Sequence, residues 1–417
     1  MFAFLFNFLS PYAHPFEKKV DRFLKKIKSS SNPIKIHKGL EALMQENLVV
    51  VNLWIEKKYK NYLYLNKKVR RELYRNTTFL TEDFLSTIQT SPPSNEAFRH
   101  VLSSFEATFT PDQHQRLLHL FAIMTYLRPG GRYHYEAASN FGKLLKNPAQ
   151  EHLIGDCNQV VTLYAYFYSL KFPLSELKIK ILPGHVCLHF EGIDIEATSG
   201  QFDQYKEFEH ILPITEIIST NLLDVNDEQV KTGTIEPRTL LKCAQLAYLI
   251  SSLRKLVDQN LKIAYQNVGV SLLKSGNWDS AIFFIQQTGD PVLLAQSYEH
   301  AALSTLKDHR FSKAEYYARA SGDRTLQKKV AYGQGAYHYN QKQFLKAIPY
   351  FEKASEEAMV KAAYQGQCGV VLHKVRGVKT VIEAKRHRSD FQNLKKWARL
   401  GGNHEIEAYA EETLRKI

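Results

Sequence analysis

Alternation of apolar and polar residues marks two short segments near the middle of the chain, HVCLHF at 185–190 and IDIEAT at 193–198. A period of two is typical of a β-strand that buries one face. The dipeptide Glu191-Gly192 between the two segments has the length and composition of a tight hairpin turn. The pattern therefore predicts a β-hairpin.

A two-residue turn fixes which side chains share a face of this hairpin. One face is wholly apolar. The other face carries His185, Cys187, His189, Asp194, Glu196 and Thr198. His189 lies directly opposite Asp194, and His185 lies on the diagonal from Glu196, within cross-strand reach. The sequence thus predicts two histidine–carboxylate pairs on one face of a sheet.

A long apolar run from Val160 to Leu170 follows Cys157 and predicts a buried helix. Asp156 can cap this helix, which makes Cys157 its first residue. The helix dipole and the free N–H groups of a first turn favour the reactive thiolate form of a cysteine. The Asp156 carboxylate opposes that effect unless it points at the amides. Cys157 is therefore a candidate nucleophile, and a small core cysteine is the alternative.

The segment before Cys157 offers less chemistry. TPDQHQRLLHLFAIMTYLRPGG at 110–131 predicts a helix that Thr110 caps and the Pro-Gly-Gly triplet ends. Acyl transfer also needs an oxyanion donor besides the backbone amide of Cys157. Gln150 precedes the cysteine by seven residues, but the sequence does not place it.

The C-terminal part repeats with a period of 33 residues. The equivalent positions are Gly269, Ala302 and Gly335, then Trp278, Phe311 and Phe344, then Ala281, Ala314 and Ala347. Small residues let two helices approach closely, and an aromatic residue anchors the second helix of each pair. A degenerate fourth copy is expected at Gly369, Val378 and Val381. The pattern predicts stacked helix pairs.

The N-terminal part is basic, with 16 Lys or Arg against 6 Asp or Glu in residues 1–80. The run at 56–75 interleaves basic residues with tyrosines, which would suit an acidic partner or nucleic acid. No nucleic-acid motif accompanies it, so nucleic-acid binding is not expected. We interpret the run as the solvated face of amphipathic helices whose core positions are Leu63, Leu65, Val69 and Leu73.

Four cysteines without a CxxC pair indicate a reducing compartment. The greasy N-terminus, MFAFLFNFLSPYAHPF, lacks the pattern of a secretory signal and is too short to span a bilayer. We expect it to pack on the rest of the chain, and we expect a cytoplasmic protein with no membrane span. The predicted organisation is a helical basic region at 1–108, an α+β domain at 109–220, a linker at 221–236, and a helical repeat domain at 237–417.

G-x-C at the start of a buried helix, Gly-His on a strand and IEATSG at 195–200 resemble the transglutaminase-like superfamily of cysteine enzymes. The repeats resemble tetratricopeptide repeats, most closely at 329–357, and one bacterial branch of the superfamily joins the two. The resemblance implies a multidomain protein with a papain-like α+β core and a C-terminal α-α superhelix.

Carried over to this chain, the resemblance implies that Cys157 is the nucleophile, His185 the base and Glu196 the carboxylate that orients the base. Glu196 stands where Asp is usual, and Cys187 where a bulky residue is common. Asp194 therefore remains an alternative to Glu196, and His189 an alternative to His185.

The sequence favours an enzyme that needs no cofactor and attacks an amide of a peptide or protein through a thioester, with hydrolysis preferred over cross-linking. The repeats would bind the substrate or a partner. One alternative is a metal site built from Cys157, His185, Cys187 and His189. Another is a protein-interaction scaffold whose triad is only a remnant.

Overall fold

The computed structural model describes residues 10–137, 140–149, 151–206, 210–225 and 235–417. The contacts divide the chain into two compact units, residues 1–268 and 269–417. The described chain is mostly helical and contains one small antiparallel sheet. The predicted start of the repeat domain, residue 237, lies within the first unit.

The sheet of the first unit has five antiparallel strands in the order β6-β5-β4-β3-β7. The strands are β3 (Lys178–Leu182), β4 (His185–Phe190), β5 (Ile193–Glu196), β6 (Gln201–Asp203) and β7 (His210–Pro213). A separate parallel pair joins β1 (Tyr133–Tyr135) to β2 (Leu153–Gly155).

The predicted hairpin is confirmed as β4–β5. His189 pairs with Asp194 in the expected register. Glu191 and Gly192 form the turn with φ angles of 48° and 84°, the positive values that a tight hairpin turn of this kind requires. Glycine adopts such a value without strain, so the position of Gly192 is explained.

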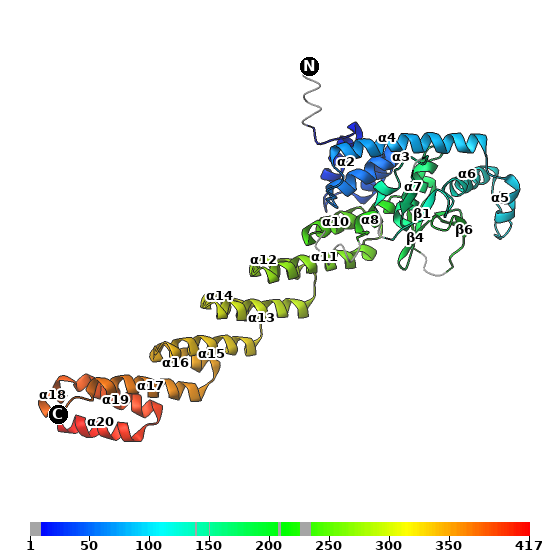
Figure 1. Ribbon diagram of the computed structural model, residues 1–417. Coiled ribbons are helices and arrows are strands. Elements are labelled where there is room, and N and C mark those ends of the chain that lie inside the picture. Colours follow the sequence, from blue (N-terminus) through cyan, green and yellow to red (C-terminus); the bar gives the residue numbers. More distant parts are fainter. Residues whose placement is uncertain (1–9, 138–139, 150, 207–209, 226–234) are drawn as a thin grey trace, which may run out of the picture. The chain divides into compact units, whose positions relative to one another are not determined.

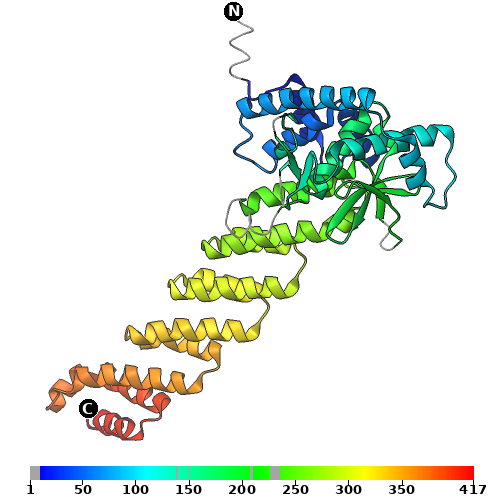
Figure 2. The ribbon, with the colours of Figure 1, turned by 45° about the vertical axis from the view of Figure 1, so that its right-hand side comes forward.

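Helix α7 (Cys157–Ser169) is the central helix of the first unit, and the prediction that Asp156 caps it is confirmed. It packs against β4 and against three helices, α3, α6 and α8 (Figures 1 and 2). Their bounds are Pro33–Lys58, Pro111–Leu127 and Glu216–Leu223. Nearly all α7 side chains are buried, which explains why the run is apolar all round. The predicted capping of α6 by Thr110 is also confirmed.

The N-terminal helices share one hydrophobic core with the sheet and α7, a cluster that extends from Phe16 to Ile250. They are α2 (Pro15–Lys26), α3, α4 (Lys67–Thr90) and α5 (Asn95–Leu102). The predicted helical character of this region is confirmed. The predicted boundary after residue 108 does not divide the core, because α3 and α4 pack on elements that follow it.

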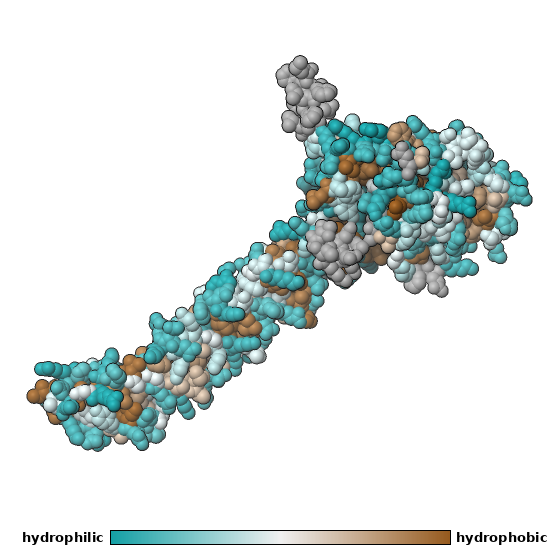
Figure 3. Space-filling model, in the orientation of Figure 1, coloured by the Kyte–Doolittle hydropathy of each residue, from teal (hydrophilic) through white to brown (hydrophobic). Residues whose placement is uncertain are grey.

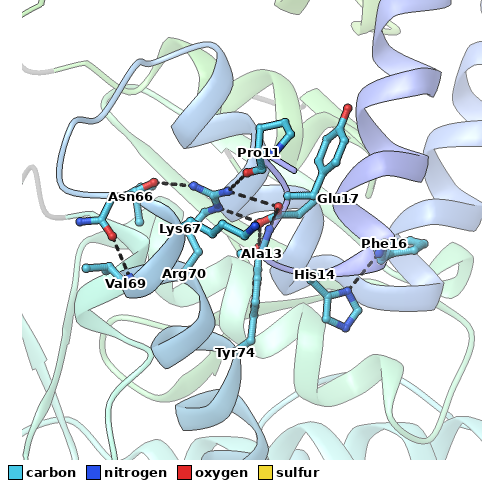
Figure 4. A network of polar contacts seen from close by, with 12 residues as sticks. Pro11, Ala13, His14, Phe16, Glu17, Asn66, Lys67, Val69, Arg70 and Tyr74 are labelled. Carbon is cyan, nitrogen blue, oxygen red and sulfur yellow. Dashed lines mark hydrogen bonds and ion pairs between the residues drawn. The ribbon is translucent and has the colours of Figure 1, made fainter. Parts of the chain in front are cut away.

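The interpretation of the basic run was partly wrong. Leu65 and Leu73 are buried as expected, but Leu63 is 82% exposed, because it lies in the turn between α3 and α4. Arg70 is not solvated either. Its side chain is 2% exposed and forms an ion pair with Glu17, with 2.7 Å between Nε and Oε1 (Figure 4).

Arg70 also donates to the carbonyl oxygens of Pro11 and Leu65, and the Tyr74 hydroxyl donates to Glu17. These bonds satisfy most polar atoms of the buried pair, as a buried ion pair requires. One arginine of the basic run therefore joins α4 to α2 and to the chain just before it.

Two predictions fall partly outside the described residues. Of the greasy N-terminus, residues 1–9 lie outside them. Of the predicted linker, residues 226–234 lie outside them, while Asn221 to Leu223 complete α8. Helix α10 (Pro237–Ile250) follows and packs on α8.

The second unit consists of helices, and it begins within α11 (Arg254–Lys274). The remaining helices are α12 (Trp278–Gln286), α13 (Pro291–Lys307), α14 (Phe311–Ala320), α15 (Arg324–Asn340), α16 (Phe344–Ala354), α17 (Glu357–Val375), α18 (Val381–Arg386), α19 (Arg388–Gly401) and α20 (His404–Lys416). Consecutive helices pack as pairs, among them α13 with α14 and α15 with α16.

The small residues of the repeat lie where helices cross, as predicted. A Cβ atom at Gly269 would come within 2.4 Å of Ile285, and one at Gly335 within 2.7 Å of Phe351. The predicted fourth copy was wrong at Gly369, where a Cβ would meet no described atom within 4 Å. The close approach is instead at Gly366, which faces Phe344.

No helix among the described residues is long and apolar enough to cross a membrane. On the side that Figure 3 shows, hydrophilic residues cover most of each unit, and apolar residues form scattered areas.

Candidate active site

Cys157 lies at the first residue of α7, and its side chain borders a cleft. The Asp156 carboxylate accepts a hydrogen bond from the Gln159 N–H at 3.0 Å and so points at the helix amides. This removes the objection that Asp156 would disfavour a thiolate at this position. Cys157 is 9% exposed. Its side chain therefore lies at the edge of the core and borders the cleft.

His185, at the start of β4, lies between Cys157 and Glu196. Its Nε2 is 2.6 Å from Glu196 Oε2, and its ring also forms a side-chain hydrogen bond with Cys157. Because Nε2 faces the carboxylate, Nδ1 is the ring nitrogen left to exchange a proton with the thiol. The structure therefore brings together the three residues that the sequence singled out.

Two further residues hold Glu196 in place. Thr198 donates to Oε1 from its backbone N–H at 3.1 Å and from its hydroxyl at 2.5 Å. The Tyr205 hydroxyl donates to Oε2 at 3.1 Å. Both carboxylate oxygens are thus bound, and the orientation of the imidazole is fixed through Glu196.

The electrostatics favour an imidazolium at His185. Hydrogen bonds to Cys157 and to Glu196 raise its pKa from 6.5 to about 10, against the opposing effect of burial. Burial alone would raise the pKa of Glu196, but the hydrogen bonds from His185 and Thr198 outweigh it and leave the pKa below its ordinary value. The group is therefore arranged as a carboxylate, an imidazolium and a cysteine side chain joined by hydrogen bonds.

The second predicted pair, His189 with Asp194, also forms, but the surrounding sheet provides partners for both of its residues. His189 Nδ1 is 2.7 Å from Asp194 Oδ1, and His189 Nε2 accepts the Gly192 N–H at 3.3 Å. Asp194 further binds Lys180 Nζ at 2.9 Å and the Tyr205 N–H at 2.8 Å. Both ring nitrogens of His189 are thus occupied within the sheet.

The other three cysteines are poorly suited to nucleophilic chemistry. Burial raises the pKa of Cys187 well above its usual range, and the Asp194 and Glu196 carboxylates raise it further. Burial raises the pKa of Cys243 to about 12 and also raises that of Cys368. In the described ranges, no three His, Cys, Asp or Glu side chains gather as metal ligands would.

The cleft beside Cys157 has a volume of about 260 Å³. It is bordered by α7, the β3–β4 turn, α8, the end of α10 and the first turns of α11. Cys157 and His185 both line it, so a substrate group in the cleft would meet the thiol and the imidazole together.

Sequence reasoning missed several residues around the site. The alternation of KIKIL, residues 178–182, could have placed Lys180 on the polar sheet face. Nothing in the sequence pattern indicates Tyr205 or Asp224, because their roles depend on contacts between distant segments. Gln150, the candidate oxyanion donor, lies outside the described residues.

Comparison with known proteins does not assign the chain to a family. No protein-family model matches the chain, and no curated protein matches it.

Proposed function

We propose that the protein is a cysteine hydrolase or acyl transferase of the transglutaminase-like kind, with a papain-like core around α7 and the sheet. Cys157 is the nucleophile, His185 the acid–base residue and Glu196 the orienting carboxylate. The observation that carries the proposal is the position of the His185 imidazole, hydrogen-bonded to Cys157 on one side and to Glu196 at 2.6 Å on the other. A nucleophile, its base and the residue that orients the base are the parts that such chemistry requires.

The reaction follows from these contacts. The proton of the thiol resides on His185, so Cys157 attacks the carbonyl carbon of a peptide or protein amide as a thiolate. The C–N bond then breaks, the imidazolium protonates the leaving amine, and a thioester remains on Cys157. Water or a second amine attacks the thioester and releases the thiol.

The start of α7 also offers an oxyanion donor. The Asp156 carboxylate takes up the N–H groups of Asn158 and Gln159. The Cys157 N–H is the donor that we assign to the developing oxyanion, as expected for an amide at a helix N-terminus. The repeat unit would hold the substrate or a partner, in the manner of tetratricopeptide repeats.

The test combines labelling with turnover. With iodoacetamide at pH 7 and peptide mapping by mass spectrometry, Cys157 should be labelled at least tenfold faster than Cys187, Cys243 and Cys368. With a mixed peptide library, the wild type should release cleaved or deamidated products. Cys157→Ala should release none, and Cys368→Ala, which changes a thiol of the second unit, should behave as the wild type.

A different result would favour the scaffold interpretation. If Cys157 is labelled no faster than a small free thiol and the library remains unchanged, the triad is a remnant and the protein acts only by binding.

A further inference from the structure

The cleft beside Cys157 has an unbalanced set of charges. Its charged lining side chains are the carboxylates of Glu216 and Asp224 and the imidazole of His185. Among the described residues, no lysine or arginine lines it. The His185 charge is matched by Glu196 at 2.6 Å. The buried Lys60 ammonium donates to the Asp224 carbonyl oxygen at 2.8 Å from outside the lining and offsets one of the two remaining carboxylates, so the other carboxylate leaves the cleft negative.

Both carboxylates are held in place by the fold. Glu216, at the start of α8, is 2% exposed and accepts the Ser252 N–H. Asp224, just after α8, accepts the Gln159 side-chain amide at 3.0 Å through Oδ2. Fixed carboxylates of this kind create a local potential that attracts cations and repels anions.

Ser219 provides an independent indication of a ligand. It lies on α8 between the two carboxylates, is 2% exposed and lines the cleft. Its hydroxyl has no hydrogen-bond partner among the described residues. A buried polar group is normally paired. The hydroxyl oxygen is itself buried at the wall of the cleft, so a change of the Ser219 rotamer would bring it to an N–H group that enters the cleft.

The apolar part of the lining completes the description. Leu223, Leu256 and Val257 border the same cleft. An apolar wall with carboxylates and a hydroxyl suits a side chain with an aliphatic stem and a charged head, which lysine and arginine provide. A purely apolar group would leave Ser219 unpaired, and an acidic group would be repelled by both carboxylates.

We infer that the cleft binds a lysine or arginine side chain of the peptide or protein substrate, adjacent to the amide that Cys157 attacks. The inference rests on the proposed function for the reaction, but not for the binding. It assigns Glu216 and Asp224 to recognition of the cation and Ser219 to a hydrogen bond with its N–H groups.

Charged thiol reagents test this directly. Three methanethiosulfonates, one with a trimethylammonium group, one with a sulfonate and one neutral, should be compared on Cys157, with rates normalised to 2-mercaptoethanol. The cationic reagent should react at least tenfold faster than the anionic one, because two nearby carboxylates act in a partly desolvated cleft.

Matched variants locate the source of the preference. Asp224→Asn keeps an oxygen for Gln159 and removes the charge, so it should lower the cation-to-anion ratio about threefold or more. Asp112→Asn removes the same charge from an 83% exposed side chain on α6 and should leave the ratio unchanged. Thermal unfolding verifies that both variants are folded.

A binding measurement separates this inference from the proposed function. Calorimetry with Cys157→Ala should show that N-acetyl-lysine methylamide binds at least tenfold more tightly than its norleucine counterpart. If Cys157 reacts fast with the neutral reagent but shows no cation preference, and lysine has no advantage, only the inference is overturned. If Cys157 is unreactive while lysine binds, the proposed function fails and the cation site stands.

Discussion

The hairpin β4–β5 carries a histidine beside a carboxylate at two places, near its open end and next to its turn. At the open end, His185 Nε2 is hydrogen-bonded to Glu196, and the opposite edge of the imidazole faces Cys157 and the cleft. Next to the turn, His189 gives Nδ1 to Asp194 and Nε2 to the Gly192 N–H. The same two residue types thus form an open pair and a closed pair.

The difference lies in what surrounds each carboxylate. Asp194 binds Lys180, which is 5% exposed, and so belongs to a charge-balanced group inside the sheet. Glu196 accepts hydrogen bonds from neutral groups, the hydroxyls of Thr198 and Tyr205. Its negative charge is therefore balanced by His185. A histidine–carboxylate pair becomes suited to proton transfer only when one ring nitrogen remains available to a reacting group.

The largest effect should come from breaking the open pair. In His185→Ala, Cys157 loses the imidazolium that is hydrogen-bonded to it. Labelling of Cys157 by iodoacetamide at pH 6 should slow by roughly 10²-fold, because an ordinary thiol is almost wholly protonated there. Peptide mapping by mass spectrometry gives the rate at this cysteine alone.

His189→Ala is the matched comparison. It removes the same side chain from the same strand, and labelling of Cys157 should stay within a factor of about three of the wild type. The reverse order, with the larger loss in His189→Ala, would mean that the closed pair serves the thiol and that the assignment is wrong.

Breaking the closed pair should affect stability instead. Lys180→Met keeps an aliphatic side chain but leaves the Asp194 carboxylate, which is 1% exposed, without its cation. Removing one partner of a buried ion pair costs about 3–5 kcal/mol. Urea unfolding of Lys180→Met should show a loss of this size for the transition of the first unit.

Lys178→Met provides the control, since Lys178 is exposed on the same strand. A surface change of this kind should alter the free energy of unfolding by no more than about 0.5 kcal/mol. Equal effects of the two substitutions would show that the Lys180–Asp194 contact does not stabilise the fold.

The geometry of both pairs was available from the sequence because it depends on local features. A two-residue turn and strict alternation determine which residues face each other in a hairpin, and the pairing of His189 with Asp194 follows from them. The start of α7 was equally local, since Asp156 caps it from the adjacent position. In the second unit, a period of 33 residues was enough to place Gly269 and Gly335 at helix crossings.

The surroundings that make one pair open and the other closed could not be predicted from the sequence. They depend on contacts with segments that are distant in sequence. Tyr205 reaches Glu196 from beyond β6, and Asp224 reaches the cleft from the end of α8. The ion pair between Arg70 and Glu17 spans 53 residues and has no local signal. Because of this tertiary contact, Arg70 is buried, although the local pattern predicted a solvated surface for the basic run.

The smallest effect concerns the charge that Glu196 supplies to His185. The pKa of His185 is raised to about 10, by Cys157 first and by Glu196 second. In Glu196→Gln the shape is kept and the charge is lost, so this pKa should fall by about one unit and still remain above 6.5, because the contribution of Cys157 persists. NMR titration of the His185 imidazole, assigned by its absence in His185→Ala, measures the change.

The direction of the linked stability follows from the same shift. Because the pKa of His185 is higher in the folded protein, its stabilising contribution is complete below about pH 6.5 and is lost as the pH rises through about 10. In Glu196→Gln that loss should be complete at a lower pH, and a shift of one unit corresponds to about 1.4 kcal/mol.

Asp194→Asn changes the closed pair and should leave the pKa of His185 unchanged. If Asp194→Asn moves the His185 pKa as far as Glu196→Gln does, the two pairs are electrostatically one group and the distinction between open and closed pairs fails.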